Sequence, residues 1–161
     1  TRGCRSMRLS TRGRYAVMAM ADLAIHAHGN PVKLGEIAER QNLSLSYLEQ
    51  LFRHLRKSGV VKSIKGPGGG YLLSRPSSEI RISDIIFSVS EPISATRCAP
   101  LSSDGCTNPK TKCLTHGLWE ELGNQIHLYL SSVSLEDVCK GNRSNFSSAK
   151  KQNQTFDTMS K

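Results

Sequence analysis

The sequence has no long apolar run, few aromatic residues and few acidic ones. It lacks a run of about 18 apolar residues, the length that a membrane span needs, so we expect no membrane-spanning helix. Residues 1–7 are basic but precede no apolar segment, which argues against a secretory signal and predicts a cytoplasmic protein. Acidic residues number 13 against 22 basic ones, a formal net charge of +9. This excess favours a polyanionic partner.

Motifs of catalysis are also missing. The glycine run at 66–70 is not a phosphate-binding P-loop, because no Lys-Ser or Lys-Thr pair follows it. No nucleophile lies in a recognisable pattern with a base, so we do not expect an enzyme. The five cysteines are odd in number and follow no secretion signal, which argues against a disulfide framework. We assign Cys4 and Cys139 no ligand role.

The positive charge is concentrated in the first half of the chain. Residues 1–75 contain 13 basic and 4 acidic side chains, whereas residues 76–139 contain 4 and 8. Residues 140–161 contain 5 basic and 1 acidic side chain. We therefore expect a polyanion-binding surface within residues 1–75.

The pattern of apolar residues and turn signals predicts a mainly α chain with one small β-hairpin. We expect helices over about 11–28, 34–41, 45–58, 83–90 and 115–132, and a last helical turn over 134–139. Strands are expected over 60–64 and 71–73 around the glycine turn. The order predicts a winged helix-turn-helix followed by a long helix.

Three of these helices carry more specific expectations. The first has apolar residues that recur at helical spacing: Tyr15, Met18, Ala19, Leu23 and Ala24. The third should bury Leu45, Leu48, Phe52 and Leu55, begin with a Ser46–Glu49 capping box and end at a left-handed Gly59. Ser83 is expected to cap the short helix that follows the hairpin.

The third predicted helix has the polar face that a DNA recognition helix needs. Opposite its leucines lie Ser46, Tyr47, Glu49, Gln50, Arg53, Arg56 and Lys57. Glutamine can contact adenine, glutamate can accept from cytosine, and serine can contact several base edges. The cations Arg53 and Lys57 suit phosphates better. Such a face alone is typical of a solvated helix; the basic half and the hairpin together make DNA binding the favoured interpretation.

The hairpin would serve as the wing. Lys65 lies at its tip, where a long cation can reach the minor groove. Glycines there, Gly66, Gly68 and Gly69, would let the backbone approach the duplex closely.

A second group of residues has the composition of a metal site. The spacing Cys98-x7-Cys106-x6-Cys113-x2-His116 supplies three thiols and an imidazole, a complete ligand set for zinc or an iron–sulfur cluster. Zinc sites usually use tight Cys-x2-4-Cys pairs, which are missing here, so the long spacings favour a cluster. The alternative is three unpaired surface thiols and a histidine that caps a helix.

Four stretches carry a resemblance to a known family. They are MRLSTRGRYAVMAM, SLSYLEQLFRHLRKSGVV, KGPGGGYLL and ATRC…C…CLTHGLW. Between Met7 and Cys139 the chain resembles the IscR family of iron–sulfur cluster-sensing transcription regulators. The resemblance implies a homodimeric winged-helix repressor or activator that controls iron–sulfur assembly genes and receives its [2Fe–2S] cluster from assembly proteins.

The resemblance also implies roles for particular residues. The cluster ligands would be Cys98, Cys106, Cys113 and His116. The DNA-reading residues would be Ser44, Ser46, Tyr47, Glu49 and Gln50, with Lys65 on the wing. The sequence departs from the family in longer spacings between the cysteines and in a lysine at 65 where relatives have arginine. Lysine is a point charge without a planar fork, so readout of minor-groove shape should weaken.

The long helix over 115–132 is the expected dimer interface. Its apolar stripe contains Leu118, Leu122, Ile126, Tyr129 and Leu130, with Trp119 beside it. The stripe could pack on the chain's own core, but the head already has one, so we favour a dimer. A two-fold dimer would bind a pseudo-palindromic operator on double-stranded DNA.

These expectations divide the chain into five segments. Residues 1–6 are expected to be a non-native or upstream extension, 7–90 the DNA-binding domain, 91–113 the cluster-binding loop, 114–139 the dimerisation helix and C-terminal turn, and 140–161 a disordered tail. The alternatives to this function are a related nitric-oxide or iron sensor with a different cluster, and a DNA-binding protein with structural zinc.

Overall fold

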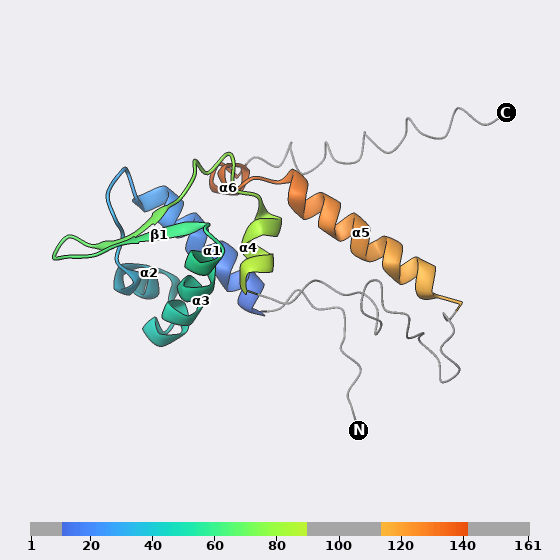
Figure 1. Ribbon diagram of the computed structural model, residues 1–161, viewed down its shortest axis with the longest axis horizontal. Coiled ribbons are helices and arrows are strands. Elements are labelled where there is room, and N and C mark those ends of the chain that lie inside the picture. The colour runs from blue at the N-terminus through green and yellow to red at the C-terminus, as the bar shows by residue number, and fades with distance from the viewer. Residues whose placement is uncertain (1–10, 90–113, 142–161) are drawn as a thin grey trace, which may run out of the picture.

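The computed structural model describes residues 11–89 and 114–141. Predictions for residues 1–10, 90–113 and 142–161, including Cys4, the three clustered cysteines and the tail, lie outside the described residues. Within the described ranges the elements are α1 Thr11–His26, α2 Leu34–Gln41, α3 Leu45–Lys57, β1 Val61–Ile64, β2 Gly70–Leu73, α4 Ile82–Val89, α5 His116–Ser132 and α6 Leu135–Cys139 (Figure 1). The mainly helical fold with a hairpin wing is confirmed.

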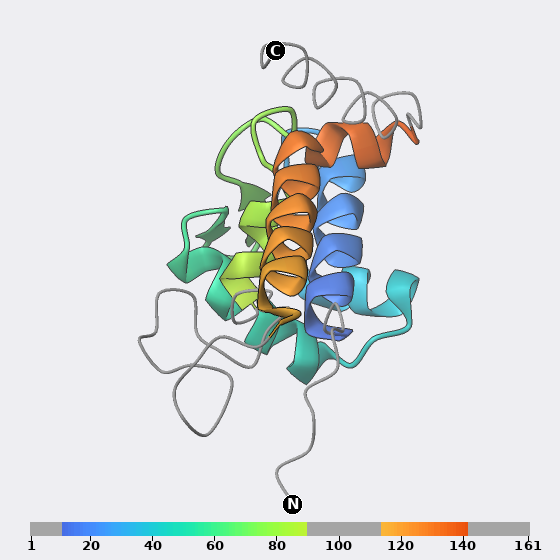
Figure 2. The ribbon, with the colours of Figure 1, turned by 90° about the vertical axis from the view of Figure 1, so that its right-hand side faces the viewer.

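One apolar core joins α1, α3, α4 and α6. It is built from side chains with almost no exposure, among them Met20 and Leu23 of α1, Phe52 of α3 and Ile85 of α4. Figure 2 views the molecule from the side of α5 and shows α1 and α4 behind that helix. The core therefore holds the helix-turn-helix and the wing together as one head.

The predicted burial of Leu45 in α3 is wrong, and Met18 of the apolar pattern in α1 is also exposed. Met18 is 41% exposed and Leu45 is 46% exposed, whereas Met20 and Leu51 are fully buried. Both pairs of residues fit a helical stripe in the sequence. The orientation of each helix on its neighbours decides which member lies inside.

The turn between α2 and α3 is short and held by its own residues. Asn42 ends α2 in the left-handed conformation (φ 51°), and Ser44 caps α3 by accepting a hydrogen bond from the Tyr47 N–H over 3.2 Å. The predicted Ser46–Glu49 capping box is therefore wrong by two residues. Gly59 after α3 has φ 74°, as expected.

The wing is anchored to the chain that precedes α2. Strands β1 and β2 pair antiparallel from Val61 opposite Leu73 to Ile64 opposite Gly70. Val32 extends this sheet by one bridge to Tyr71, with N–H···O distances of 3.0 and 2.8 Å. A Cβ on Gly70 would lie 2.5 Å from the Val32 carbonyl oxygen, so this crossing requires glycine.

The end of α5 returns to the head beside α4. The Ile82 N–H donates to the Val133 carbonyl over 3.0 Å, and the Leu135 N–H donates to the Ile80 carbonyl over 2.8 Å. The short α6 begins at a capping box between Ser134 and Asp137. Ser83 does not cap α4, which begins one residue earlier; instead its side chain is buried.

Figure 1 shows α5 extending from the head on the side opposite the wing. It is 17 residues long and contains no buried residue in the single chain. Neither α5 nor any other helix of the described residues is long and apolar enough to cross a membrane.

Candidate nucleic-acid interface

The recognition helix α3 separates its buried and exposed sides cleanly. Its buried residues are Leu48, Leu51, Phe52 and Leu55. The predicted contact residues Ser46, Glu49, Gln50 and Arg53 are all exposed. Since the leucines fix the helix against the core, these four side chains occupy one outward face that a DNA groove could meet.

Two predicted contact residues at the start of α3 also have structural tasks. The hydroxyl of Ser44 is the helix cap, although its residue is exposed. Tyr47 is half-buried and meets Tyr15 of α1 edge to face, with ring centroids 5.9 Å apart. The structure thus brings the first turn of α3 against α1 and leaves Ser44 and Tyr47 only partly available to a ligand.

The wing tip presents a cation on an open turn. Lys65 is exposed, and Gly66 follows it with φ 111°, a conformation that favours glycine. A Cβ added to Gly68 would meet no atom within 4 Å, and its φ is not positive. Gly69 differs, because a Cβ there would overlap the carbonyl oxygen of Ile64. The fold itself therefore explains glycine at Gly66 and Gly69 but not at Gly68, and close approach of this turn to DNA remains a prediction.

One hydrogen bond ties the wing to the recognition helix. Arg56 near the end of α3 donates from Nη1 to the Ser63 hydroxyl of β1 over 3.4 Å. In contrast, Arg53, Lys57 and Lys65 form no ion pair among the residues of 11–89 and 114–141. Their charges are thus available to phosphates.

A buried carboxylate that the sequence analysis did not single out fixes the helix-turn-helix to α1. The side chain of Asp22 is 1% exposed and accepts from Arg40 at the end of α2 over 2.6 and 3.1 Å. Gln41 donates to the second oxygen over 2.7 Å, and the His26 ring lies 3.4 Å away. The sequence feature that could have indicated this buried carboxylate is the position of Asp22, an acidic residue between the apolar Ala19 and Leu23 on the core side of a helix.

This contact is electrostatically favourable despite its burial. Burial raises the pKa of Asp22, but hydrogen bonds from Arg40 and Gln41 and the Arg40 charge outweigh that effect and bring the pKa below its ordinary value. The same hydrogen bond raises the pKa of Arg40. The pair is therefore ionised and holds α2, and with it the turn into α3, in one position.

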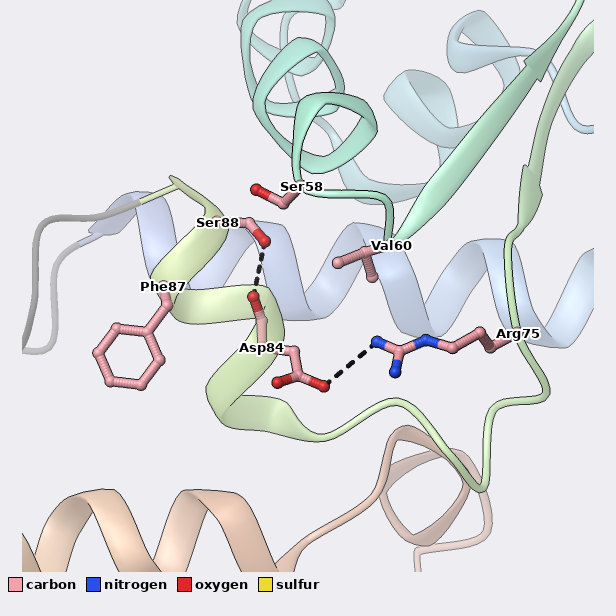
Figure 3. Close-up of a pocket in the computed structure, with 6 residues that line it drawn as sticks. All are labelled: Ser58, Val60, Arg75, Asp84, Phe87 and Ser88. Atoms are coloured by element: carbon pink, nitrogen blue, oxygen red, sulfur yellow. Dashed lines mark hydrogen bonds and ion pairs between the residues drawn. The ribbon is translucent and has the colours of Figure 1, made fainter.

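A cavity among the described residues lies where the wing leaves the head (Figure 3). It has a volume of about 270 Å³ and is lined by Ser58, Val60, Arg75, Asp84, Phe87 and Ser88. Arg75 and Asp84 form an ion pair of 3.4 Å across it, and the Ser88 hydroxyl donates to the Asp84 carbonyl over 2.6 Å. The cavity is open to solvent, and its charged groups pair with each other between α4 and the segment that follows the wing.

Only one predicted cluster ligand lies among the described residues. His116 is the first residue of α5; its side chain is 12% exposed, with Nε2 3.9 Å from Glu120 Oε2. Residues 11–89 and 114–141 contain no group of three or more histidine, cysteine or acidic side chains that could hold a metal. A site with three or more such ligands would therefore need donors from residues 1–10, 90–113 or 142–161.

Cys139 of α6 packs against α1. It is half-buried, and its thiol donates to the Ala21 carbonyl over 3.8 Å. Burial, together with the nearby Glu136 carboxylate, raises the pKa of this thiol, so it is protonated at neutral pH.

A short-turn helix pair, a basic wing and a solvent-facing recognition helix define a winged-helix DNA-binding protein. The chain belongs to the Rrf2 family, described as iron-dependent transcriptional regulators, whose sequence pattern matches residues 9–141. Within that family it is a regulator of the IscR type, which confirms the resemblance seen in the sequence.

Individual relatives support this assignment. The chain is 53% identical over 132 residues to the HTH-type transcriptional regulator IscR of Photorhabdus laumondii subsp. laumondii, a match that covers 82% of this chain and 79% of that protein. It is 51% identical over 134 residues to IscR of Xenorhabdus nematophila, covering 83% and 80%. These relatives are transcriptional regulators, which agrees with the expectation that the chain is not an enzyme.

Solved structures share the fold. IscR of T. potens matches with a TM-score of 0.67 and 38% identity over 86% of this chain and 90% of that one. CymR, the global cysteine regulator of B. subtilis, matches with a TM-score of 0.68 and 36% identity over 83% and 97%. The fold of this chain is therefore shared with an IscR and with a cysteine regulator.

Proposed function

We propose that this chain is a homodimeric DNA-binding regulator that senses iron–sulfur status through a [2Fe–2S] cluster and controls iron–sulfur assembly genes. The observation that carries the proposal is the α3 face of Ser46, Glu49, Gln50 and Arg53, exposed together above a fully buried leucine stripe in a chain of IscR type. Residues 7–90 would form the DNA-binding domain.

The exposed side chains suit separate tasks in the complex. Gln50 and Ser46 would contact base edges in the major groove, while Arg53 would bind a phosphate. Lys65 would reach the minor groove from the wing tip. Glu49 would discriminate between sites, because a carboxylate that faces DNA is repelled by phosphates unless a cytosine amino group donates to it.

The second copy of the chain would cover α5. This helix exposes Leu118 at 62%, Leu128 at 58%, Tyr129 at 40% and Trp119 at 38%. Leu130 instead packs against the head, so the predicted stripe divides between two surfaces. Residues that are apolar, exposed and gathered on one helix favour association. A two-fold dimer would place its two recognition helices about 34 Å apart, on a pseudo-palindromic operator.

The proposed cluster ligands are Cys98, Cys106, Cys113 and His116, with residues 91–113 as the binding loop. Three thiols and an imidazole fit a [2Fe–2S] cluster as a donor set, and His116 stands at the start of the proposed dimer helix. The fraction of chains that hold a cluster there would depend on the supply of iron and on oxidants. Iron–sulfur assembly proteins would be its donors.

Two variants test the proposal on anaerobically purified protein. Glu49→Ala should relax the preference of the cluster-free protein for particular DNA sites. Selection of bound duplexes from a random-sequence pool measures this preference. If the selected sequence is unchanged, Glu49 does not discriminate between sites. Cys98→Ala should lose colour and iron while keeping its helical circular dichroism. Colour that survives in Cys98→Ala would show that the ligand assignment is wrong.

Dimerisation has its own test. Leu118→Glu should convert the dimer to a monomer in multi-angle light scattering, because a charge would be placed in an apolar interface. Glu121→Gln, at an exposed polar position on the same helix, is the control and should remain dimeric. A monomeric wild-type protein at micromolar concentration would contradict the proposed assembly.

A further inference from the structure

The beginning of α1 lies close to the beginning of the recognition helix. Tyr15 and Tyr47 are in ring contact, with centroids 5.9 Å apart. Tyr47 follows Ser46 and lies two residues before Glu49, both proposed base-reading residues. A duplex held against the first turns of α3 would therefore lie near side chains that come from the first turn of α1.

Two arginines in that first turn lie on different sides of α1. Arg12 is four and seven residues before Ala16 and Ala19, which are fully buried, so helical spacing aligns it with the side that packs on the head. Arg14 is four residues before Met18, which is 41% exposed, and so lies on the outward side. Arg12 is thus the cation on the side of α1 that faces the head, three residues before Tyr15, which contacts α3.

The fold gives Arg12 no task of its own. It is exposed and forms no ion pair or hydrogen bond within the described part of the chain, whereas Arg40 and Arg75 are paired with Asp22 and Asp84. The first turn of α1 contains no acidic residue. A cation at this end of a helix is disfavoured by the helix dipole, so helix stability does not explain its presence.

We propose that Arg12 contacts a DNA phosphate beside the bases that α3 reads, which makes α1 a third element of the DNA interface. This inference rests on the proposed DNA binding and extends it to a segment that the recognition helix and wing do not include. The guanidinium fork suits a phosphate, and such a contact adds affinity that is independent of base sequence.

The experiment measures the salt dependence of binding to mixed-sequence DNA. Fluorescence anisotropy with a labelled duplex of about 30 base pairs, in about 50 to 200 mM KCl, gives the slope of log affinity against log salt. Each lost phosphate contact should reduce that slope by about 0.9. We expect Arg12→Gln to reduce it by that amount per bound chain and to bind roughly tenfold more weakly at the lowest salt.

Two further variants make the result specific. Arg14→Gln removes the same charge from the outward side of the same turn, and its slope should stay close to that of the wild type. Lys65→Gln removes the proposed wing contact and should lower the slope. Thermal unfolding of Arg12→Gln should match that of the wild type, so that a binding loss cannot come from misfolding.

The outcomes separate the inference from the proposed function. A normal slope for Arg12→Gln beside a reduced slope for Lys65→Gln would overturn the role of Arg12 and leave DNA binding intact. Equal losses in Arg12→Gln and Arg14→Gln would also overturn it, because the effect would then be one of net charge. Wild-type protein that binds no duplex at all would refute the proposed function itself.

Discussion

Replacing Asp22 with asparagine should weaken the attachment of α2 to α1 while hardly changing side-chain shape. The carboxylate is 1% exposed and accepts from both Arg40 and Gln41 at distances of 2.6 to 3.1 Å. Removing one partner of a buried ion pair typically costs about 3–5 kcal/mol. Arg40 is 32% exposed and can regain water, so we expect a lower cost of about 2–3 kcal/mol.

The charge of Asp22 also predicts how the difference in stability between the wild type and Asp22→Asn depends on pH. Its pKa is lowered in the folded protein, so its stabilisation is fully present above the ordinary value of 3.8 and is lost as pH falls through the lower folded value. The stability gap between wild type and Asp22→Asn should therefore be constant near neutral pH and narrow in strong acid.

Urea unfolding followed by circular dichroism measures both effects. Glu39→Gln removes an exposed carboxylate from the same α2 and should change stability by less than about 0.5 kcal/mol. A double-mutant cycle with Arg40→Gln should give a coupling energy of at least about 1 kcal/mol. The reasoning is refuted if Asp22→Asn is as stable as the wild type at neutral pH, or if the gap stays unchanged in acid.

Two paired substitutions test other parts of the fold by the same unfolding assay. Gly70→Ala should destabilise the protein by about 2 kcal/mol or more, since its Cβ would press on a backbone carbonyl at 2.5 Å, whereas Gly68→Ala should change stability by less than about 0.5 kcal/mol. Leu51→Ala should cost about 2–5 kcal/mol and Leu45→Ala less than about 1 kcal/mol, because only Leu51 is buried; the reverse order would contradict the orientation of α3.

Local signals were enough to predict the helix and strand boundaries of the head. Clear turn signals separate the helices: the Gly29–Asn30–Pro31 turn, the Asn42–Leu43–Ser44 turn and Gly59. Most predicted boundaries therefore agree with those of the structure within one or two residues. The polar face of α3 followed from helical spacing, and the described structure leaves its predicted base-reading residues exposed, apart from the half-buried Tyr47.

Other features depend on contacts between distant parts of the chain. Whether Leu45 or Leu51 is buried depends on how α3 sits against α4, and both fit the same spacing. The requirement for Gly70 comes from Val32, which precedes α2. The pairing of Asp22 with Arg40 likewise needs α1 and α2 to be packed together, so no local pattern predicts it.

The most direct test of the central claim is the visible spectrum of anaerobically purified wild-type protein, with iron and acid-labile sulfide assayed on the same sample. A [2Fe–2S] regulator should show charge-transfer bands and about two iron and two sulfide per chain. A colourless protein that contains zinc would make the site structural and contradict the account. A colourless protein without metal would contradict it as well and would leave a winged-helix regulator with another signal.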